Sequence, residues 1–202
     1  MNRVVIGRLA LAGLGGMFAG SWAPAVAQAR PVRVVIETSM GNIEAELDSV
    51  HAPISVKNFL AYVDSGLYAN GQFHRTVRAD NQPNNPVKIT VIQAGQDPAR
   101  RAEHFPAIEL ERTSLTGLHH VDGTLSMARS GPNTATSDFF ICIGPQPELD
   151  FGGKRNADGQ GFAAFGRVTR GMEVVRAINA APADANQRLT PPITITRIRR
   201  VP

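Results

Sequence analysis

The chain has 202 residues, of which 43% are hydrophobic and 19% are charged. This length supports one globular domain with a substantial core, and it is too short for two domains of ordinary size. The formal net charge is only +4, so composition does not indicate nucleic acid or an anionic membrane surface as a partner. Cys142 is the only cysteine. An intramolecular disulfide is therefore excluded, and we interpret Cys142 as a core residue rather than a nucleophile.

Residues 1–29 differ from the rest of the chain. Arg3 and Arg8 are the only charged residues there, and a short apolar run and several alanines follow them. This pattern predicts a secretory signal peptide cleaved after Ala27 or Ala29, with an uncleaved membrane anchor as the alternative. The apolar run is shorter than the roughly 20 residues of a membrane-spanning helix. We therefore expect a periplasmic or secreted protein without a membrane span, and with less positive charge once the two arginines are removed.

Residues 33–47 alternate between apolar and polar side chains on either side of a turn at Gly41. The alternation predicts a half-buried antiparallel hairpin with one apolar face and one wet face. Further along, apolar residues recur at helical spacing over residues 56–63, with Pro53 suited to the first turn and Gly66 to the stop. We expect an amphipathic helix that packs on one side.

Two short runs, residues 124–129 and 138–143, have the β-branched and aromatic content of strands. Between them, residues 130–137 are rich in Gly, Pro, Asn, Ser and Thr, and this segment is too long for a tight hairpin, so we expect a shaped loop. Phe139 and Phe140 are adjacent and must point to opposite faces of a strand. One ring can then fill the core while the other lines a cleft, and a hairpin with two core rings is the alternative.

Later segments complete an all-β pattern with few helices. A second helix is predicted near residues 172–178, residues 184–189 are interpreted as an ordinary surface loop, and a last strand is expected over residues 193–198. The isoleucines of that strand do not all share one face, so a bulge or bend is expected near Arg197. Several short strands, two helices and many turn residues favour a closed antiparallel barrel or a sandwich, and periodicity alone does not choose between them.

Three segments carry the strongest signal, and they are Phe73-His74-Arg75, Val91-Ile92-Gln93, and the run from Gly123 to Gly144 that contains Met-Ala, Gly-Pro-Asn-Thr and Ser-x-Phe-Phe-Ile. Together and in this order they resemble the cyclophilin family of peptidyl-prolyl isomerases, in which they build one groove. The resemblance covers about residues 32–201. It implies a mainly β fold, a closed eight-stranded antiparallel barrel with an α-helix capping each end, in one domain over residues 30–202.

The resemblance implies isomerisation of the peptide bond before proline. The cis and trans forms differ by about 1 kcal/mol and are separated by a barrier of about 18 to 20 kcal/mol, which comes from amide resonance. A charged, planar guanidinium can donate a hydrogen bond to the prolyl nitrogen of the twisted amide, and we assign this role to Arg75. By resemblance, Gln93 would hold a substrate carbonyl, and Phe140 would form the floor of a proline pocket while Phe139 faces the core.

Other groove positions are carried over from the family in the same way. They are expected to bind an extended peptide through side-chain contacts and through backbone pairing at residues 128–129. The expected substrate-binding residues are Phe73, His74, Val91, Ala128, Arg129, Asp138, Leu149 and Phe162.

The chain departs from the best-known family members at several positions of the groove. Ile89 or Thr90 stands where a pocket phenylalanine is common, and Asp138 replaces a glutamine. Glu148 falls where a tryptophan contacts the inhibitor cyclosporin, so poor inhibition by cyclosporin is expected. Residues 76–88 are longer than the usual link between the arginine and glutamine strands, and we interpret them as an insertion at the rim of the groove.

Other kinds of site find little support in the sequence. His119 and His120 are adjacent, so their side chains point apart, and no third ligand stands at a metal-site spacing; neither a metal nor another cofactor is expected. No Gly-x-Ser-x-Gly elbow or other nucleophile motif supports a hydrolase. We expect a monomer acting on proline-containing polypeptides, namely unfolded or partly folded exported proteins. The alternative is a proline-peptide binding module that hardly catalyses, but such a module has no need of Arg75.

Overall fold

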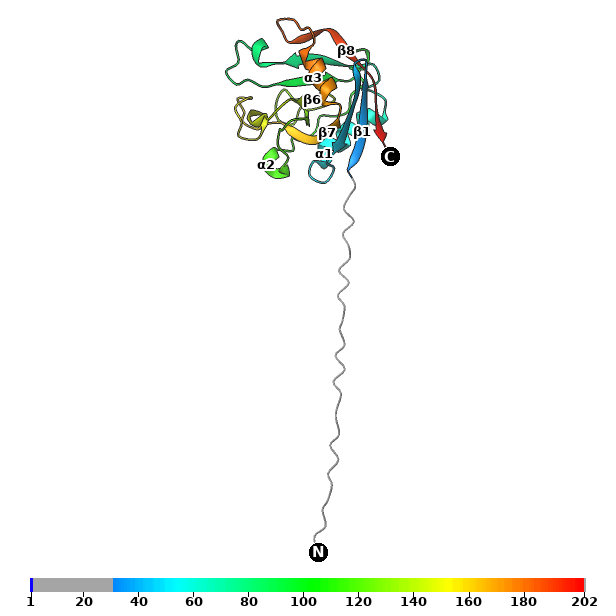
Figure 1. The fold of residues 1–202 in the computed structure, drawn as a ribbon, viewed down its shortest axis with the longest axis vertical. Helices are drawn as coiled ribbons and strands as arrows, with labels where there is room; N and C mark the ends of the chain where they lie inside the picture. The colour runs from blue at the N-terminus through cyan, green and yellow to red at the C-terminus, as the bar shows by residue number, and fades with distance from the viewer. Residues whose placement is uncertain (2–30, 202) are drawn as a thin grey trace.

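A computed structural model describes Met1 and residues 31–201; apart from Met1, the predicted signal peptide and its cleavage position lie outside the described residues. Eight antiparallel strands close into a barrel in the order β1-β2-β7-β5-β6-β4-β3-β8 (Figure 1). The strands are β1 Val32–Thr38, β2 Gly41–Leu47, β3 Gly71–Val77, β4 Val91–Gly95, β5 Thr124–Met127, β6 Phe139–Cys142, β7 Ala163–Arg170 and β8 Arg188–Val201. This arrangement confirms the closed barrel and excludes the sandwich.

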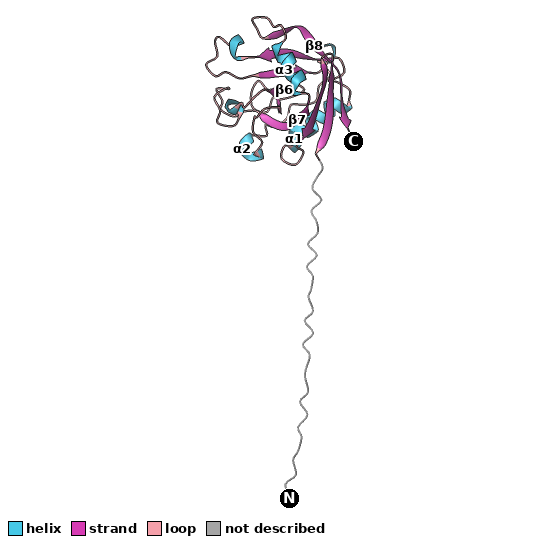
Figure 2. Cartoon of the chain, in the orientation of Figure 1, coloured by secondary structure: helices cyan, strands magenta, loops and turns pink. Residues whose placement is uncertain are grey.

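Three α-helices accompany the barrel, and helical segments are cyan in Figure 2. They are α1 Pro53–Asp64, α2 Thr113–Thr116 and α3 Met172–Ala180, and short 3₁₀ turns cover Ala79–Asn81, Pro98–Arg100 and Pro147–Leu149. The two helices predicted from periodicity correspond to α1 and α3, which lie toward opposite ends of the barrel (Figure 1). The four-residue α2 was not expected, because a single turn leaves no periodic apolar pattern.

The first hairpin follows the alternation of its sequence. Ile43, Ala45 and Leu47 of β2 are buried, while the polar residues between them are exposed or half-buried. The turn at Gly41 has a φ of 129°, which a residue without a Cβ adopts at little cost. The predicted half-buried antiparallel pair is therefore confirmed.

The last strand is longer than residues 193–198, because β8 pairs with both β1 and β3 to close the barrel. The pairing register with β1 shifts in the middle of β8 and leaves Thr196 as an extra residue. This bulge lets both Ile195 and Ile198 point into the core, where they are 0% and 5% exposed. The irregularity predicted near Arg197 is confirmed.

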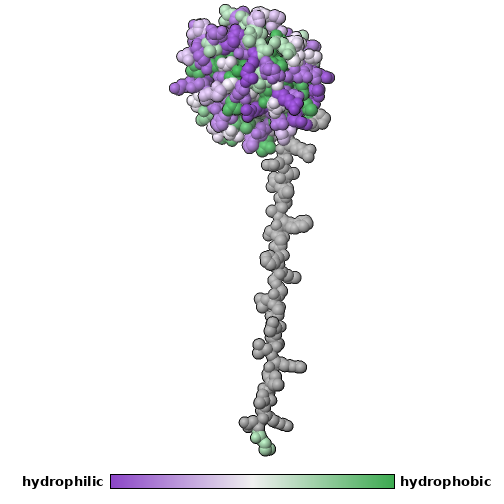
Figure 3. Space-filling view, viewed as in Figure 1, coloured by the Kyte–Doolittle hydropathy of each residue, from purple (hydrophilic) through white to green (hydrophobic). Residues whose placement is uncertain are grey.

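The main core lies inside the barrel and under its helices. The Phe59 ring of α1 lies 5.3 Å from the ring centroids of Tyr68, Phe139 and Phe165, and α3 contributes the fully buried Ile178. Tilted and edge-on ring pairs at this spacing add to the stabilisation that comes from burial. The surface in Figure 3 is mainly hydrophilic, with scattered apolar side chains. Within the described residues, no helix is both long and apolar enough to cross a membrane.

A second, smaller apolar cluster lies on the outer face of the barrel. The neighbours Phe139 and Phe140 point to opposite faces of β6: Phe139 belongs to the main core, and Phe140 belongs to the outer cluster. The hairpin with two core rings is therefore wrong. Cys142 is fully buried, as predicted, but it lies in the outer cluster together with Phe140. Burial raises the pKa of the Cys142 thiol, so it is an inert packing group.

Candidate functional site

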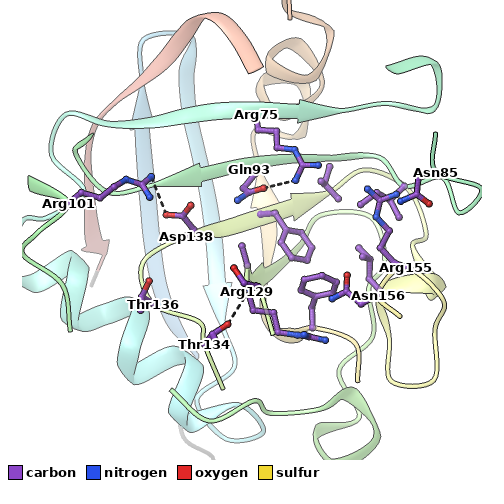
Figure 4. Close-up of a pocket in the computed structure, with 17 residues that line it drawn as sticks. Arg75, Asn85, Gln93, Arg101, Arg129, Thr134, Thr136, Asp138, Arg155 and Asn156 are labelled. Carbon is purple, nitrogen blue, oxygen red and sulfur yellow. Dashed lines mark hydrogen bonds and ion pairs between the residues drawn. The ribbon is translucent and has the colours of Figure 1, made fainter. Parts of the chain in front are cut away.

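A pocket of about 500 Å³ opens over the outer cluster, where loops rise above strands β3, β4 and β6 (Figure 4). It is lined by Arg75, Asn85, Ile89, Val91, Gln93, Arg101, Ala128, Arg129, Ser130, Thr134, Thr136, Asp138, Phe140, Leu149, Arg155, Asn156 and Phe162. All three predicted catalytic residues and six of the eight predicted substrate-binding residues are in this set. The structure therefore brings together segments that lie far apart in the sequence.

The three predicted catalytic residues form one row across adjacent strands. Arg75 of β3 is directly opposite Gln93 of β4, and Gln93 is directly opposite Phe140 of β6. Directly opposed residues in antiparallel strands project to the same face of a sheet. The barrel therefore presents a cationic donor, an amide and an aromatic ring side by side on its outer face.

A bulge in β3 determines which side chains reach this face. The register with β4 shifts between Phe73 and Arg75 and leaves His74 as the extra residue. Without the bulge, Phe73 and Arg75 would share a face. Instead Phe73 is fully buried in the main core, so its predicted role in substrate binding is corrected to a packing role.

His74 does not line the pocket, but it lies near a residue that does. Its Nε2 is 3.8 Å from an Asp138 carboxylate oxygen, and the other oxygen of Asp138 is 3.8 Å from the guanidinium of Arg101. Burial lowers the pKa of His74, and the Asp138 carboxylate opposes that shift. His74 is therefore placed beside the pocket, next to Asp138, and not among the residues that line it as predicted.

Amide oxygens hold the Arg75 guanidinium in place. Its Nε and Nη2 donate to Gln187 Oε1 at 3.0 and 2.6 Å, and its Nη1 donates to Gln93 Oε1 at 3.1 Å. Burial lowers the pKa of Arg75, but the guanidinium is so strong a base that it stays charged at neutral pH. Because Oε1 of Gln93 is occupied, its Nε2 group is the part of the amide suited to a substrate carbonyl.

No role in the site was predicted for Gln187, because residues 184–189 were interpreted as an ordinary surface loop. The residue has a φ of 68°, an uncommon left-handed conformation for a side chain other than Gly, Asn or Asp. Its Nε2 donates to the Asn81 carbonyl at 2.8 Å while its Oε1 accepts from Arg75. The loop is therefore part of the site, and no local sequence pattern could show that it folds back onto β3.

The floor of the pocket is apolar. Phe140 packs edge-on against Phe162 with ring centroids 5.3 Å apart. Val91 and Leu149 belong to the same cluster as Phe140, and both line the pocket. Of the two residues expected at the variable wall position, Ile89 lines the pocket and Thr90 does not. This apolar floor beside Arg75 suits a proline ring.

Phe140 is supported by the ring of His120, which two hydrogen bonds hold in place. The His120 ring stacks on Phe140 at 5.9 Å and 15°, its Nδ1 lies 2.6 Å from Asp150 Oδ1, and its Nε2 lies 2.9 Å from Ser126 Oγ. This order of groups is that of a hydrolytic triad. Ser126, however, is fully buried, so no substrate can reach its hydroxyl, and these hydrogen bonds act as a support for the pocket floor.

The adjacent histidines both contact the Asp150 carboxylate, so the expectation that their side chains point apart is wrong. His119 Nδ1 lies 2.8 Å from Asp150 Oδ2, and His120 uses the other oxygen. Burial raises the pKa of Asp150, but hydrogen bonds from His120 and His119 outweigh burial and leave the pKa below its ordinary value. In the part of the chain that the structure describes, no cluster of three or more His, Cys, Asp or Glu residues is placed to hold a metal.

Arg129 is fixed against the side of the pocket. Its guanidinium forms a paired contact with the Asp158 carboxylate at 2.7 and 2.9 Å, and it lies 5.0 Å from the Phe162 ring centroid. The N–H of Ala128 donates to the Asp138 carbonyl at 2.9 Å. Backbone pairing of a peptide with Ala128 would therefore use the Ala128 carbonyl.

The loop predicted as a rim insertion lies at the rim. Asn85 lines the pocket, and the buried Gln82 ties the loop together by donating to the carbonyls of Arg78 and Ile89 at 2.7 Å. Glu148 is not among the pocket-lining residues, and its carboxylate accepts from the Lys154 N–H at 2.8 Å. The sequence placed this loop correctly but gave no sign of the contacts that fix it.

Comparison with known proteins gives one consistent result. A profile of the family described as "Cyclophilin type peptidyl-prolyl cis-trans isomerase/CLD" matches residues 33–200. Peptidyl-prolyl cis-trans isomerase A of Dickeya dadantii is 37% identical over 163 residues, 79% of this chain and 77% of that protein. Peptidyl-prolyl cis-trans isomerase-like 1 of Rhizopus delemar is 40% identical over 160 residues, 77% of this chain and 85% of that protein.

The fold agrees with these sequence matches. A crystal structure of a cyclophilin-type peptidyl-prolyl cis-trans isomerase from Cryptosporidium parvum superposes with a TM-score of 0.69 at 27% identity, covering 86% of this chain and 99% of that one. The profile matches nearly the whole described region, and it includes every residue of the row formed by Arg75, Gln93 and Phe140. This chain belongs to the cyclophilin-type peptidyl-prolyl cis-trans isomerases.

Proposed function

We propose that Arg75 accelerates rotation about Xaa-Pro bonds by donating a hydrogen bond to the prolyl nitrogen when the amide is twisted. The observation that carries this proposal is that Gln187 and Gln93 hold the guanidinium beside the apolar floor formed by Phe140. In the planar amide the nitrogen lone pair is delocalised, and in the twisted amide it becomes an acceptor. The contact is therefore strongest in the transition state, which is the condition for raising kcat.

The rest of the pocket would hold the peptide while one side of the bond rotates. The ring of the proline would lie on Phe140 and Phe162, and the Gln93 Nε2 would donate to a substrate carbonyl. Fixing one end of the substrate removes part of the entropic cost of reaching the twisted state. A structure of the Cryptosporidium parvum relative was determined in the presence of the dipeptide Ala-Pro, which supports a proline ligand for this fold.

We further propose that the clients are unfolded or partly folded exported proteins, in the periplasm or outside the cell. Residues 1–29 support this proposal by their signal-peptide pattern. The lone cysteine supports it too, since Cys142 is fully buried and so is protected in an oxidising compartment. Expression of the full chain in a Gram-negative host, followed by fractionation and mass measurement, tests the export. A full-length protein in the cytoplasm would contradict it, and a full-length protein in the membrane would support the uncleaved anchor.

A protease-coupled isomerisation assay on a short Xaa-Pro peptide tests the catalytic proposal. We expect Arg75→Lys to lower kcat/KM at least fivefold, because lysine keeps the charge but loses the planar array of N–H donors. Arg167→Lys is the matched control, since Arg167 is exposed on β7 and does not line the pocket. Full activity of a folded Arg75→Lys protein would show that the planar guanidinium is not needed, because the lysine ammonium can also donate. Full activity of folded Arg75→Ala, which keeps no donor, would show that the proposed donation is wrong.

A further inference from the structure

The pocket is strongly cationic on a protein with little net charge. Four arginines line it, Arg75, Arg101, Arg129 and Arg155, against one acidic residue, Asp138. The formal charge of the whole chain is only +4. Positive charge is therefore concentrated at the place where a substrate binds.

Two of these arginines have carboxylate partners. Arg129 is paired with Asp158 at 2.7 Å, and Arg101 lies 3.8 Å from Asp138. Within the described residues, neither Arg75 nor Arg155 has a carboxylate oxygen within 4.0 Å. The uncompensated charge of the pocket thus belongs to these two residues.

Arg155 is fixed in the pocket by neutral groups. Its Nη1 donates to Gln82 Oε1 and to the Val87 carbonyl, both at 2.7 Å. The nearby Glu148 is bound through its carboxylate to the Lys154 N–H instead. A guanidinium has five N–H donors, and two contacts to one nitrogen leave donors available for a ligand.

The surroundings of Arg155 make a second positive charge nearby unfavourable. Burial lowers the pKa of Arg155, and the positive charge of Arg75 lowers it further. Two partly buried like charges repel each other unless an anion lies close to them. Figure 4 shows Arg155 on the side of the cavity near Asn85 and Asn156, away from Arg101 and Asp138. The carboxylate of Asp138 is therefore not placed to compensate Arg155.

We propose that the pocket selects substrates with an acidic side chain, Asp or Glu, within two residues of the isomerised proline, and that Arg155 binds its carboxylate. This inference rests on the proposed function, because it assumes that the proline lies on Phe140. A guanidinium can bind a carboxylate through two parallel hydrogen bonds, which adds geometric selectivity to the charge attraction. Arg155 is then a residue that determines specificity, and Arg75 is the catalytic one.

Kinetics on matched peptides test this inference. Each peptide is amidated, contains one proline, and carries Glu, Gln or Lys at one of the two positions before or the two positions after that proline, with Ala at the other three. We expect kcat/KM for Glu to exceed that for Gln about fivefold at one or more positions at low salt, and this ratio to fall in 0.5 M salt because screening weakens it. Lys should be the poorest substrate at the same position.

Substitutions test whether Arg155 causes the preference for Glu over Gln. In Arg155→Gln the ratio of kcat/KM for the Glu peptide to that for the Gln peptide should fall to about 1. In Arg155→Lys this ratio should lie between 1 and the wild-type value. Arg167→Gln removes the same charge from an exposed position outside the pocket and should keep the wild-type ratio. A thermal melt of each variant shows that it is folded, and a wild-type ratio in folded Arg155→Gln would overturn the inference.

Further outcomes separate this inference from the proposed function. Equal turnover of Glu and Gln peptides overturns the inference and leaves the isomerase mechanism intact. If no peptide is turned over, the proposed function fails, and fluorescence anisotropy of labelled peptides then decides the inference: a Glu preference in Kd that Arg155→Gln abolishes supports it, and equal Kd values overturn it. Peptides with a free C-terminal carboxylate serve as a comparison. If kcat/KM rises only for these and not for the amidated Glu peptides, the site recognises chain ends, which also overturns the inference.

Discussion

The contact between Gln187 and Arg75 is the clearest case in which a single side chain prepares the site for its chemistry. One amide oxygen accepts from two nitrogens of the guanidinium, at 3.0 and 2.6 Å. This contact fixes the direction of the donors before a substrate arrives, so less ordering is needed in the transition state. Gln187 is a positioning residue, since it would act on the substrate only through Arg75.

Gln187→Ala should lower kcat about three- to tenfold and leave KM nearly unchanged, which corresponds to about 0.7 to 1.4 kcal/mol. The physical reason is that the guanidinium becomes free to leave its catalytic direction while the proline pocket stays intact. Steady-state kinetics check the split between kcat and KM, and Asn186→Ala, a change to an exposed neighbour in the same loop, is the control. An equal loss of kcat in both variants would mean that the effect comes from a change in the loop's conformation and not from the contact between Gln187 and Arg75.

The ion pair between Asp158 and Arg129 gives a pH dependence that can be assigned to one residue. The hydrogen bond from Arg129 lowers the pKa of Asp158 to about 2, below the ordinary value near 3.9 in an unfolded chain. A carboxyl whose pKa is lower in the folded state stabilises the fold above the unfolded value, and this contribution is lost as the pH falls through the folded value. We therefore expect Tm to fall between about pH 4 and pH 2.

Asp158→Asn should remove this part of the acid sensitivity. The loss of Tm from pH 5 to pH 2 is expected to be smaller in the variant than in the wild type, while other carboxylates such as Asp150 still contribute in both proteins. Thermal melts at a series of pH values measure the difference. Identical pH profiles would show that the pair with Arg129 does not stabilise the fold.

At the level of secondary-structure elements, the start of α1 depends on a distant carboxylate. The N-cap residue Ala52 offers no side-chain cap, and Glu111 accepts instead from the N–H groups of Ile54 at 2.9 Å and Ser55 at 2.7 Å. The first N–H groups of a helix lack partners within the helix, and a negative charge there is favourable. The contact therefore joins the long segment before α2 to α1.

Glu111→Ala should lower the free energy of unfolding by about 1 kcal/mol, the typical value of a lost helix cap. Denaturant unfolding measures this change. Glu109→Ala is the matched control, because Glu109 is exposed and removes an equal charge nearby. Equal stability of the two variants would contradict the assigned cap.

Elements with local signals were predictable from the sequence, and contacts between elements were not. The period of two in β2 and the helical spacing in α1 appear directly in the order of apolar residues. The β3 bulge that separates Phe73 from Arg75 has no such signal, because its cause is pairing with β4 and β8. The same reason hid Gln187, whose role depends on where a loop folds back after some hundred residues of chain.

For the molecule as a whole, closure of the barrel gives the site its rigidity. The strands that carry Arg75, Gln93 and Phe140 are each paired on both sides, so no catalytic residue stands on a free sheet edge. The chemistry lies on the outer face, over a small apolar cluster, while the main core stays separate inside. Changes to the pocket should therefore alter activity more than overall stability.

Arg75 is proposed to act on the twisted amide rather than on bound substrate in its ground state. NMR exchange spectroscopy on an Ala-Pro peptide measures the cis–trans interconversion rate on the protein together with Kd. For folded Arg75→Ala we predict a rate at least tenfold lower, a cost of about 1.4 kcal/mol, with Kd changed by less than about threefold. A normal rate in the folded variant, or a loss confined to Kd, would show that Arg75 does not stabilise the twisted amide.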